Sequence, residues 1–215
     1  HGSEGDTLRS TVIYNGNLLL FGERQQYGIS GEALFTPRQP LIRAFSANKD
    51  AAYCNPAASG NFVFYSQYGD AGTSLHQMRV GALNGQQTIT SELSEDVGDW
   101  LTGRPLQIVP ITAPNFVLLR TQDHPSDLYL FGYVDDSATG ERRVESWHTL
   151  EYAAPLGTLI GVSSFRKSAL FFTARSGSIV CDSLSLSGAP DDFPCLDSAI
   201  PNAQAANLDI TPADT

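Results

Sequence analysis

Long apolar runs, clustered basic residues and helical periodicity are all scarce in this sequence, and each absence excludes a class of protein. No apolar run approaches the ~18 residues that a membrane-spanning helix requires, so we expect no membrane anchor. The adjacent basic residues Arg142-Arg143 lie close to Glu141 and Glu145. With 23 acidic and 13 basic residues and a net charge of -10, the chain is not expected to bind nucleic acid by neutralising its phosphates.

Cysteine is also scarce, and its placement argues against a metal centre. Cys54, Cys181 and Cys195 are widely separated and show no C-x-x-C spacing, whereas a zinc site needs clustered ligands. We expect Cys181, which lies in an apolar strand, to be a buried small hydrophobic residue. A Cys181–Cys195 disulfide stays open, although nothing in the sequence demands it.

Histidines and catalytic motifs are few. Apart from His1, the histidines are His76, His124 and His148, and none has a second ligand-type residue at metal spacing. No nucleophile elbow, Walker loop or H-E-x-x-H motif occurs. The sequence therefore predicts no catalytic residue, no cofactor and no metal site. Paired carboxylates for glycoside hydrolysis stay open, because two distant acids can meet in space.

Strand-length segments bounded by turn formers dominate what the sequence does contain. One short helix is expected within Glu92–Trp100, because the Gly, Pro and Asp content elsewhere argues against longer helices. The predicted strands are Thr11–Tyr14, Leu18–Phe21, Gln26–Ser30, Ala33–Thr36, Ile42–Ser46, Asn61–Gln67, Ser74–Val80, Thr88–Ser91, Leu106–Thr112, Phe116–Thr121, Asp127–Asp135, Arg143–Leu150, Leu159–Ser164, Ala169–Ala174 and Ser178–Leu184.

The strands fall into similar units at a spacing on the order of 50 residues. Each unit has an apolar strand, a short polar spacer, a hydrophobic strand, a turn and a third strand, with a fourth strand partly visible. The first strands of the units are Thr11–Tyr14, Tyr53–Cys54, Leu106–Ile111 and Leu159–Val162. Stacked small sheets cover one another's apolar faces, so we predict an all-β fold, a β-propeller-like array of small antiparallel sheets. A β-sandwich is the alternative.

The ends of the chain differ from its middle in composition and in expected structure. His1-Gly-Ser3 resembles the scar of an affinity tag, so we expect residues 1–9 to be tag scar and N-terminal extension, and the chain to be an excised portion. Residues 10–186 form the predicted β domain. Residues 187–215, rich in Pro, Asp, Ala and Asn, are expected to be an irregular tail or linker.

Two local patterns have a functional and a plain interpretation. Asp135–Glu141 places oxygen ligands on alternate positions, as a calcium loop does, but strands flank it and a hairpin loop is favoured. Exposed aromatic residues such as Tyr65, Tyr68 and Trp100 could stack on sugars. Tyrosine and tryptophan are also ordinary strand and core residues, which is the favoured interpretation.

Several blocks occur in an order that matches a known family pattern. The first runs from Val12 to Tyr27 and contains Leu18-Leu-Leu-Phe-Gly-Glu-Arg-Gln-Gln-Tyr27, followed by Leu34-Phe-Thr-Pro37. The later blocks are Gly60–Tyr65, Ser74–Arg79, Ile89–Leu93, Asp127–Tyr133, Arg143–Tyr152 and Leu159–Leu184. In this order they resemble the tail nozzle proteins, or tail tubular protein B, of short-tailed phages. The resemblance covers about residues 10–186, an internal portion of that longer protein.

The resemblance implies a structural role in the virion. In that family, copies form a ring at the distal end of the tail, which continues the channel for DNA ejection and docks adaptor and tail fibre proteins. Double-stranded DNA would pass without specific binding, because an acidic wall repels its phosphates. Candidates for lumen or partner contacts are Glu92, Glu95, Asp135 and Asp136. A carbohydrate-binding propeller and a tail-associated glycan hydrolase are the alternatives.

Overall fold

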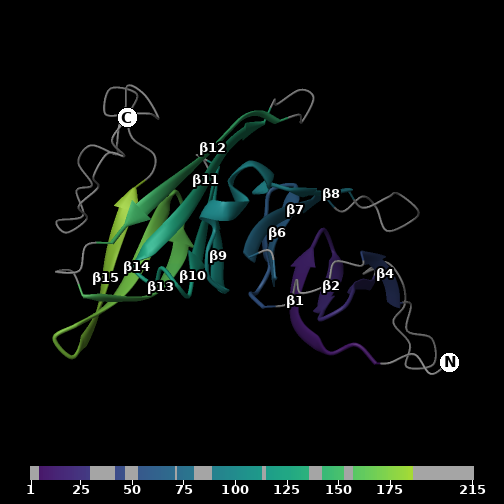
Figure 1. Cartoon of the computed structure of the whole chain (residues 1–215), viewed down its shortest axis with the longest axis horizontal. Helices are drawn as coiled ribbons and strands as arrows, with labels where there is room; N and C mark the ends of the chain where they lie inside the picture. Colours follow the sequence, from purple (N-terminus) through teal and green to yellow (C-terminus); the bar gives the residue numbers. More distant parts are fainter. Residues whose placement is uncertain are drawn as a thin grey trace. The chain divides into compact units, whose positions relative to one another are not determined.

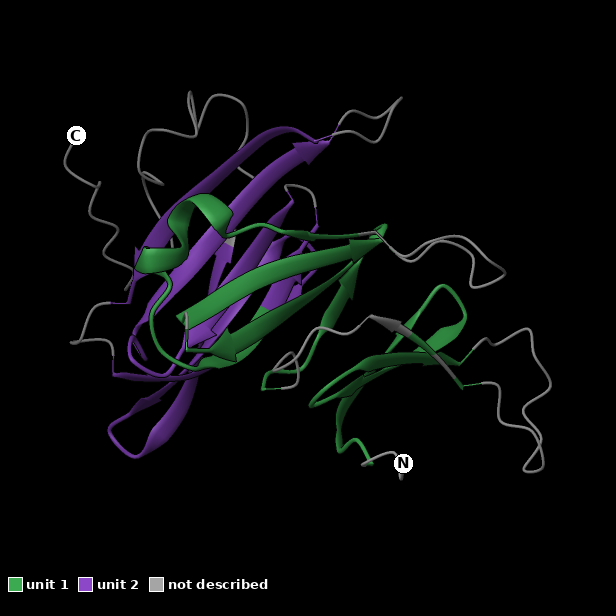
Figure 2. Ribbon diagram, turned by 45° about the vertical axis from the view of Figure 1, so that its right-hand side comes forward, with its two compact units in different colours: residues 1–108 green, residues 109–215 purple. Residues whose placement is uncertain are grey.

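The computed structural model describes residues 5–29, 42–46, 53–70, 72–79, 89–112, 115–135, 142–152 and 157–185. These residues form small antiparallel β-sheets with one short 3-10 helix (Figure 1). None of their helices is long and apolar enough to cross a membrane. The chain divides into two compact units, residues 1–108 and 109–215 (Figure 2).

The first sheet consists of β1 (Leu8–Tyr14), β2 (Asn17–Gly22), β3 (Gln26–Ile29) and β4 (Ile42–Ser46), hydrogen-bonded in chain order. Asn15-Gly16 forms the two-residue turn between β1 and β2, with φ angles of 47° and 71°. Asparagine and glycine tolerate this left-handed backbone, which matches the twist of a tight hairpin. The polar spacer seen in the sequence is therefore the hairpin turn itself.

The second sheet repeats this arrangement with β5 (Ala57–Ser59), β6 (Phe62–Gly69), β7 (Gly72–Arg79) and β8 (Ile89–Glu92). The 3-10 helix η1 (Glu95–Trp100) follows and confirms the expected short helix. The prediction that Tyr53–Cys54 forms the first strand of this second repeat is wrong, because that strand starts after Pro56. Proline disfavours a ladder position, and the small residues of β5 gave no strand signal.

The inner faces of these two sheets meet in one core. The buried residues are Tyr14, Leu19 and Phe21 from the first sheet and Val63, Tyr65 and Met78 from the second. The rings of Phe21 and Tyr65 are 5.7 Å apart. Each sheet alone would leave this apolar face in water, and burial of such side chains contributes roughly 1.5–3 kcal/mol each.

The third and fourth sheets repeat the meander. The third sheet consists of β9 (Pro105–Ile111), β10 (Phe116–Thr121), β11 (Asp127–Asp135) and β12 (Arg142–Glu151). The division between the two compact units falls within β9. β13 (Thr158–Phe165), β14 (Ser168–Arg175) and β15 (Ser178–Ser185) form the fourth. A larger core joins them: Val109, Ile111, Phe116, Leu118, Leu128, Leu130, Leu150, Tyr152, Leu159, Val162, Ala169, Phe171 and Leu184.

The all-β array of small antiparallel sheets is confirmed. The first strands predicted for the other three repeats, Thr11–Tyr14, Leu106–Ile111 and Leu159–Val162, lie within β1, β9 and β13. The predicted strand Ala33–Thr36 lies outside the described residues. The expectation that Cys181 is buried is wrong, because its thiol is exposed. Cys181 pairs with Phe172 on the outer face of β15, whereas Val180, Asp182 and Leu184 alternate toward the inside. Cys195 lies outside the described residues.

Candidate contact surfaces

The end of β8 and the helix η1 are anchored to β7 by one buried serine. Ser94 Oγ accepts a hydrogen bond from the Leu75 amide at 3.0 Å and donates one to Glu92 Oε1 at 3.0 Å. The Leu93 amide donates to the Leu75 carbonyl at 2.8 Å. These bonds fix where the acidic side chains that follow are presented.

Four exposed carboxylates gather on this segment: Glu92, Glu95, Asp96 and Asp99, called the acidic segment below. No lysine or arginine falls between Ile89 and Gly103 in the sequence. Within the described ranges, no ion pair joins these carboxylates to a basic residue. Sequence reasoning named Glu92 and Glu95 and missed Asp96 and Asp99, although the acidic density of the segment was the available signal.

His76 lies behind the acidic segment and is held by packing. Its ring stacks on Tyr65 at 5.2 Å, and its Nε2 is 2.8 Å from Ser74 Oγ. In the sheet it pairs with Glu92. Burial lowers the pKa of His76, and the charge of Glu92 opposes that shift. His76 therefore has a structural role in the sheet, since neighbouring side chains cover its ring.

The β11–β12 hairpin carries the second group of predicted contact residues. Its ladder continues beyond Gly132, which pairs with Phe116, the first residue of β10. The residues beyond that point, called the hairpin tip below, are Tyr133–Asp135 and Arg142–Glu145. Exposed Val134 and Val144 pair across its strands. The hairpin is drawn as the long green pair β11 and β12 (Figure 1).

Arg142 organises the hairpin tip. Its Nε lies 2.7 Å from Asp135 Oδ1, and its Nη1 lies 3.5 Å from Glu145 Oε2. The guanidinium also sits 4.3 Å from the ring centre of Tyr133 and 5.5 Å from that of Phe131. Burial raises the pKa of Tyr133 to about 12, with Arg142 acting against that rise. Asp135 is therefore a paired carboxylate.

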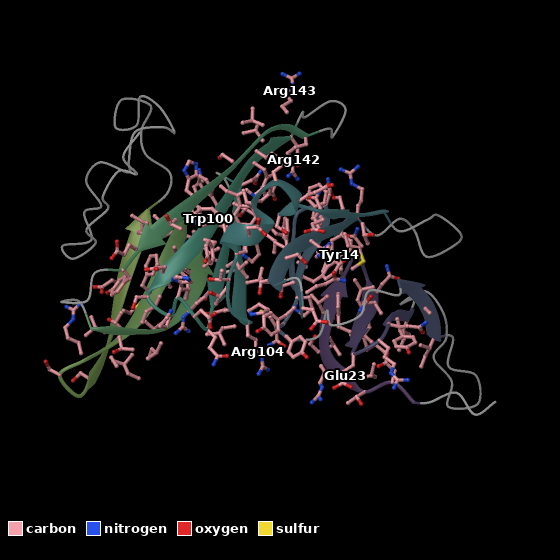
Figure 3. All side chains as sticks on the ribbon, in the orientation of Figure 1. Tyr14, Glu23, Trp100, Arg104, Arg142 and Arg143 are labelled. Carbon is pink, nitrogen blue, oxygen red and sulfur yellow. The ribbon has the colours of Figure 1, made fainter. Side chains whose placement is uncertain are left out.

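The neighbouring arginine differs from Arg142. Both side chains are labelled near the top of the hairpin, and Arg143 projects away from the ribbon (Figure 3). Arg143 is exposed, whereas the Arg142 side chain is only 18% exposed. The basic pair of the sequence thus splits into one structural and one exposed arginine.

The aromatic residues considered for sugar stacking have different environments. Tyr65 is 1% exposed and belongs to the core of the first unit, so its selection as an exposed aromatic was wrong. The pleat of β6 turns its ring inward onto Phe21. Tyr68 is half-buried and meets Tyr53 edge-on at 5.6 Å. Trp100 is 40% exposed on η1.

An arginine–tyrosine contact near Tyr68 was not foreseen. The Arg104 guanidinium lies 5.1 Å from the ring centre of Tyr53, which is 44% exposed. The two residues are far apart in the sequence, so no local motif predicts the contact. It is a cation–π interaction of a kind that contributes about 0.5–1 kcal/mol at exposed sites.

The remaining predicted groups do not gather into a metal centre. Of the loop that resembled a calcium site, Asp136–Glu141 lies outside the described residues, and Asp135 is bound to Arg142. His124 Nδ1 lies 3.3 Å from Asp127 Oδ2 on the surface. Half-buried His148 lies 3.2 Å from Ser146 Oγ. Across the described residues, no three His, Cys, Asp or Glu side chains are grouped to hold a metal ion.

Comparison with known proteins gives one family. A model described as bacteriophage nozzle protein matches residues 2–205. No curated protein matches the chain.

Proposed function

The chain belongs to the bacteriophage nozzle protein family, whose model covers nearly all of it, and we propose from this premise that it helps to form the distal channel through which DNA leaves a short tail. The family is a structural component of the virion tail. The function proposed here is assembly and conduction, with copies arranged in a ring and the duplex passing without specific binding.

The acidic segment is the observation that carries this proposal. Glu92, Glu95, Asp96 and Asp99 are exposed, and their segment contains no basic residue. Surface carboxylates act over about 8 Å at physiological ionic strength, the distance over which salt screens charge. A wall with such a segment repels phosphates and keeps DNA from adhering. The net charge of -10 supports the same behaviour.

The hairpin tip is the proposed contact for neighbouring tail proteins such as the adaptor or the tail fibres. Arg142 contacts both Asp135 and Tyr133, so these three side chains of the tip are already held together before a partner arrives. Preorganisation lowers the entropy lost on association. Exposed Val134 and Val144 supply apolar surface there. Asp136, which we also expected at this tip, lies outside the described residues.

The proposal is tested by the rate of DNA ejection from virions that carry charge-reversed protein. In the complete nozzle protein, Glu95→Lys/Asp96→Lys places two cations on the acidic segment. Because cations attract phosphates, we expect ejection to be slowed several-fold, measured on single particles with a fluorescent DNA stain. Tail assembly is checked by electron microscopy, so that a failure to assemble is not read as slow ejection.

A matched control separates position from net charge. Asp123→Lys/Glu151→Lys reverses two exposed acids of residues 109–215, outside the acidic segment. Each double variant changes the formal charge of the chain by +4, from -10 to -6. We expect the control to eject at the wild-type rate. Unchanged ejection in the Glu95→Lys/Asp96→Lys virions would overturn the proposed role of the acidic segment.

A further inference from the structure

The turn between β13 and β14 has residues that its backbone does not favour. Phe165 pairs with Ser168, so Arg166-Lys167 forms a two-residue turn, and Arg166 has a φ of 56°. Glycine and asparagine adopt such a positive φ with the least strain. Three other two-residue turns contain them: Asn15-Gly16, Gly60-Asn61 and Ser176-Gly177. An arginine in this position therefore lowers the stability of its own hairpin.

The two cations of this turn are not neutralised by their own strands. Arg166 and Lys167 are both exposed, and among the described residues no ion pair joins either of them to a carboxylate. The sequence contains no aspartate or glutamate from Tyr152 to Cys181. Strained backbone at a residue other than glycine is typical of functional sites. In a chain with a net charge of -10, the strain and the positive charge together indicate a contact with an anionic partner.

An exposed aromatic ring lies beside the two cations. Phe165, the last residue of β13, is 59% exposed. The Arg166 guanidinium lies 5.2 Å from the centre of its ring. A single exposed phenylalanine is ordinary on a protein surface, but here the ring and both cations occupy one end of a hairpin. These three residues, Phe165, Arg166 and Lys167, are called the basic turn below.

We propose that the basic turn docks on an anionic lipid surface. Arg166 and Lys167 bind the headgroup phosphates, and the ring of Phe165 enters the boundary between headgroups and acyl chains. Anionic headgroups attract lysine and arginine near the surface, and phenylalanine gains from burial at that boundary. Duplex DNA fits this group less well, because its affinity depends on many phosphate contacts and it offers the ring no apolar layer.

The proposed contact is peripheral and reversible, because two cations and one ring give weak attachment to a bilayer. The inference goes beyond the proposed function, since it uses neither the acidic segment nor the hairpin tip. The two proposals can fail separately, because the variants of the ejection experiment leave the basic turn unchanged.

The first test measures flotation of the purified chain with lipid vesicles. One kind of vesicle contains phosphatidylglycerol and phosphatidylcholine, and the other contains phosphatidylcholine alone. We expect binding to the anionic vesicles to be at least about tenfold tighter, and to weaken between about 0.05 and 0.5 M salt. A chain that does not bind the anionic vesicles, or that binds both kinds equally, would overturn the proposal.

Two variants test the basic turn itself. Arg166→Asn/Lys167→Gly installs the Asn-Gly pair of the β1–β2 turn, so we expect it to melt no lower than the wild type by circular dichroism and to bind anionic vesicles at least about tenfold less tightly. Phe165→Ser keeps the cations and removes the ring, and should bind several-fold less tightly. Unchanged vesicle binding in either variant, or a lower melting temperature of the Asn-Gly variant, would overturn the inference.

A matched pair of single variants separates position from net charge. Lys167→Gln removes one cation from the basic turn, and Arg104→Gln removes one exposed cation of residues 1–108. We expect about a fivefold loss of vesicle binding for Lys167→Gln and no loss for Arg104→Gln. Equal losses would show that net charge alone governs binding. Tighter binding to a short DNA duplex than to the anionic vesicles, abolished in Arg166→Asn/Lys167→Gly, would overturn the lipid surface in favour of nucleic acid.

Discussion

The acidic segment and the hairpin tip have similar sequences, since both contain several acidic residues near strand ends. Their carboxylates differ in the structure: those of the acidic segment are exposed, whereas Asp135 of the hairpin tip is paired with an arginine. Glu95, Asp96 and their neighbours are exposed, with no basic residue in their segment. Asp135 is bound to Arg142 at 2.7 Å, with the two side chains 21% and 18% exposed. An uncompensated charge acts at a distance on a partner, whereas a compensated one mainly stabilises its own hairpin.

Removing Arg142 should have the largest effect on stability. Arg142→Ala removes the ion pair with Asp135 and the contacts with the rings of Tyr133 and Phe131. It also leaves a half-buried carboxylate without its partner. We expect a loss of about 3 kcal/mol in the free energy of unfolding. Urea unfolding followed by Trp147 fluorescence, in a Trp100→Phe background, measures it.

Arg143→Ala is the matched control for that change, because Arg143 is the exposed neighbour on the same strand. Its loss should be below about 0.5 kcal/mol, as for most surface substitutions. Equal losses from the two alanine variants would show that Arg142 does not organise the hairpin tip.

Alkaline pH should weaken the hairpin tip next. The pKa of Tyr133 is raised from 10.0 to about 12 in the folded chain by burial. The stabilisation is therefore complete below pH 10 and is lost as pH rises toward 12, since the unfolded chain gives up the proton first. The loss is about 2 kcal/mol after allowance for solvent screening. The difference between wild type and Tyr133→Phe isolates it, and parallel curves between pH 10 and 12 would contradict it.

The two kinds of carboxylate should differ in a direct substitution. Asp135→Asn removes one charge from the Arg142 cluster, but Glu145 remains 3.5 Å from Arg142, so we expect a loss of about 1 kcal/mol. Glu95→Gln alters an exposed acid in a segment that contains no lysine or arginine. Its effect should be below about 0.5 kcal/mol. Thermal unfolding of both variants at pH 7 measures the two losses in stability. A larger loss for Glu95→Gln than for Asp135→Asn would contradict the difference between the two kinds of carboxylate.

Acidic pH should weaken the first unit slightly, the smallest of these effects. Burial lowers the pKa of His76 below 6.5, and Glu92 offsets part of that shift. The unfolded chain then binds the proton more readily, so the stability that is present above pH 6.5 is lost as pH falls through the folded pKa. His76→Gln should make the free energy of unfolding, measured by Trp100 fluorescence, less dependent on pH. An unchanged slope between pH 7 and 5 would count against a buried neutral histidine.

Local sequence patterns predicted much of the fold because hairpin sheets are made by neighbouring segments. Strand β4 (Ile42–Ser46), β10 and β11 have the bounds that the sequence indicated, and each sheet contains consecutive strands. Asn15-Gly16 announced its turn through residue types that accept positive φ. The resemblance to nozzle proteins was carried by the order of such blocks, and the family model confirms it.

The site could not be predicted to the same extent, because it depends on which face of a strand is inside. Tyr65 and Cys181 were assigned to the wrong faces, since apolar text does not reveal the phase of the pleat. A one-residue change of register moves every side chain to the other face. The pairing of Asp135 with Arg142 crosses a hairpin loop, so Asp135 looked as free as Glu95 in the sequence.

The most direct test of the account is the salt dependence of the ejection defect in Glu95→Lys/Asp96→Lys virions, expressed relative to the Asp123→Lys/Glu151→Lys control. If the acidic segment acts by uncompensated charge, the defect should shrink steadily between about 0.05 and 0.5 M salt, as the screening length shortens. A defect of constant size over that range would contradict an electrostatic role for the acidic segment.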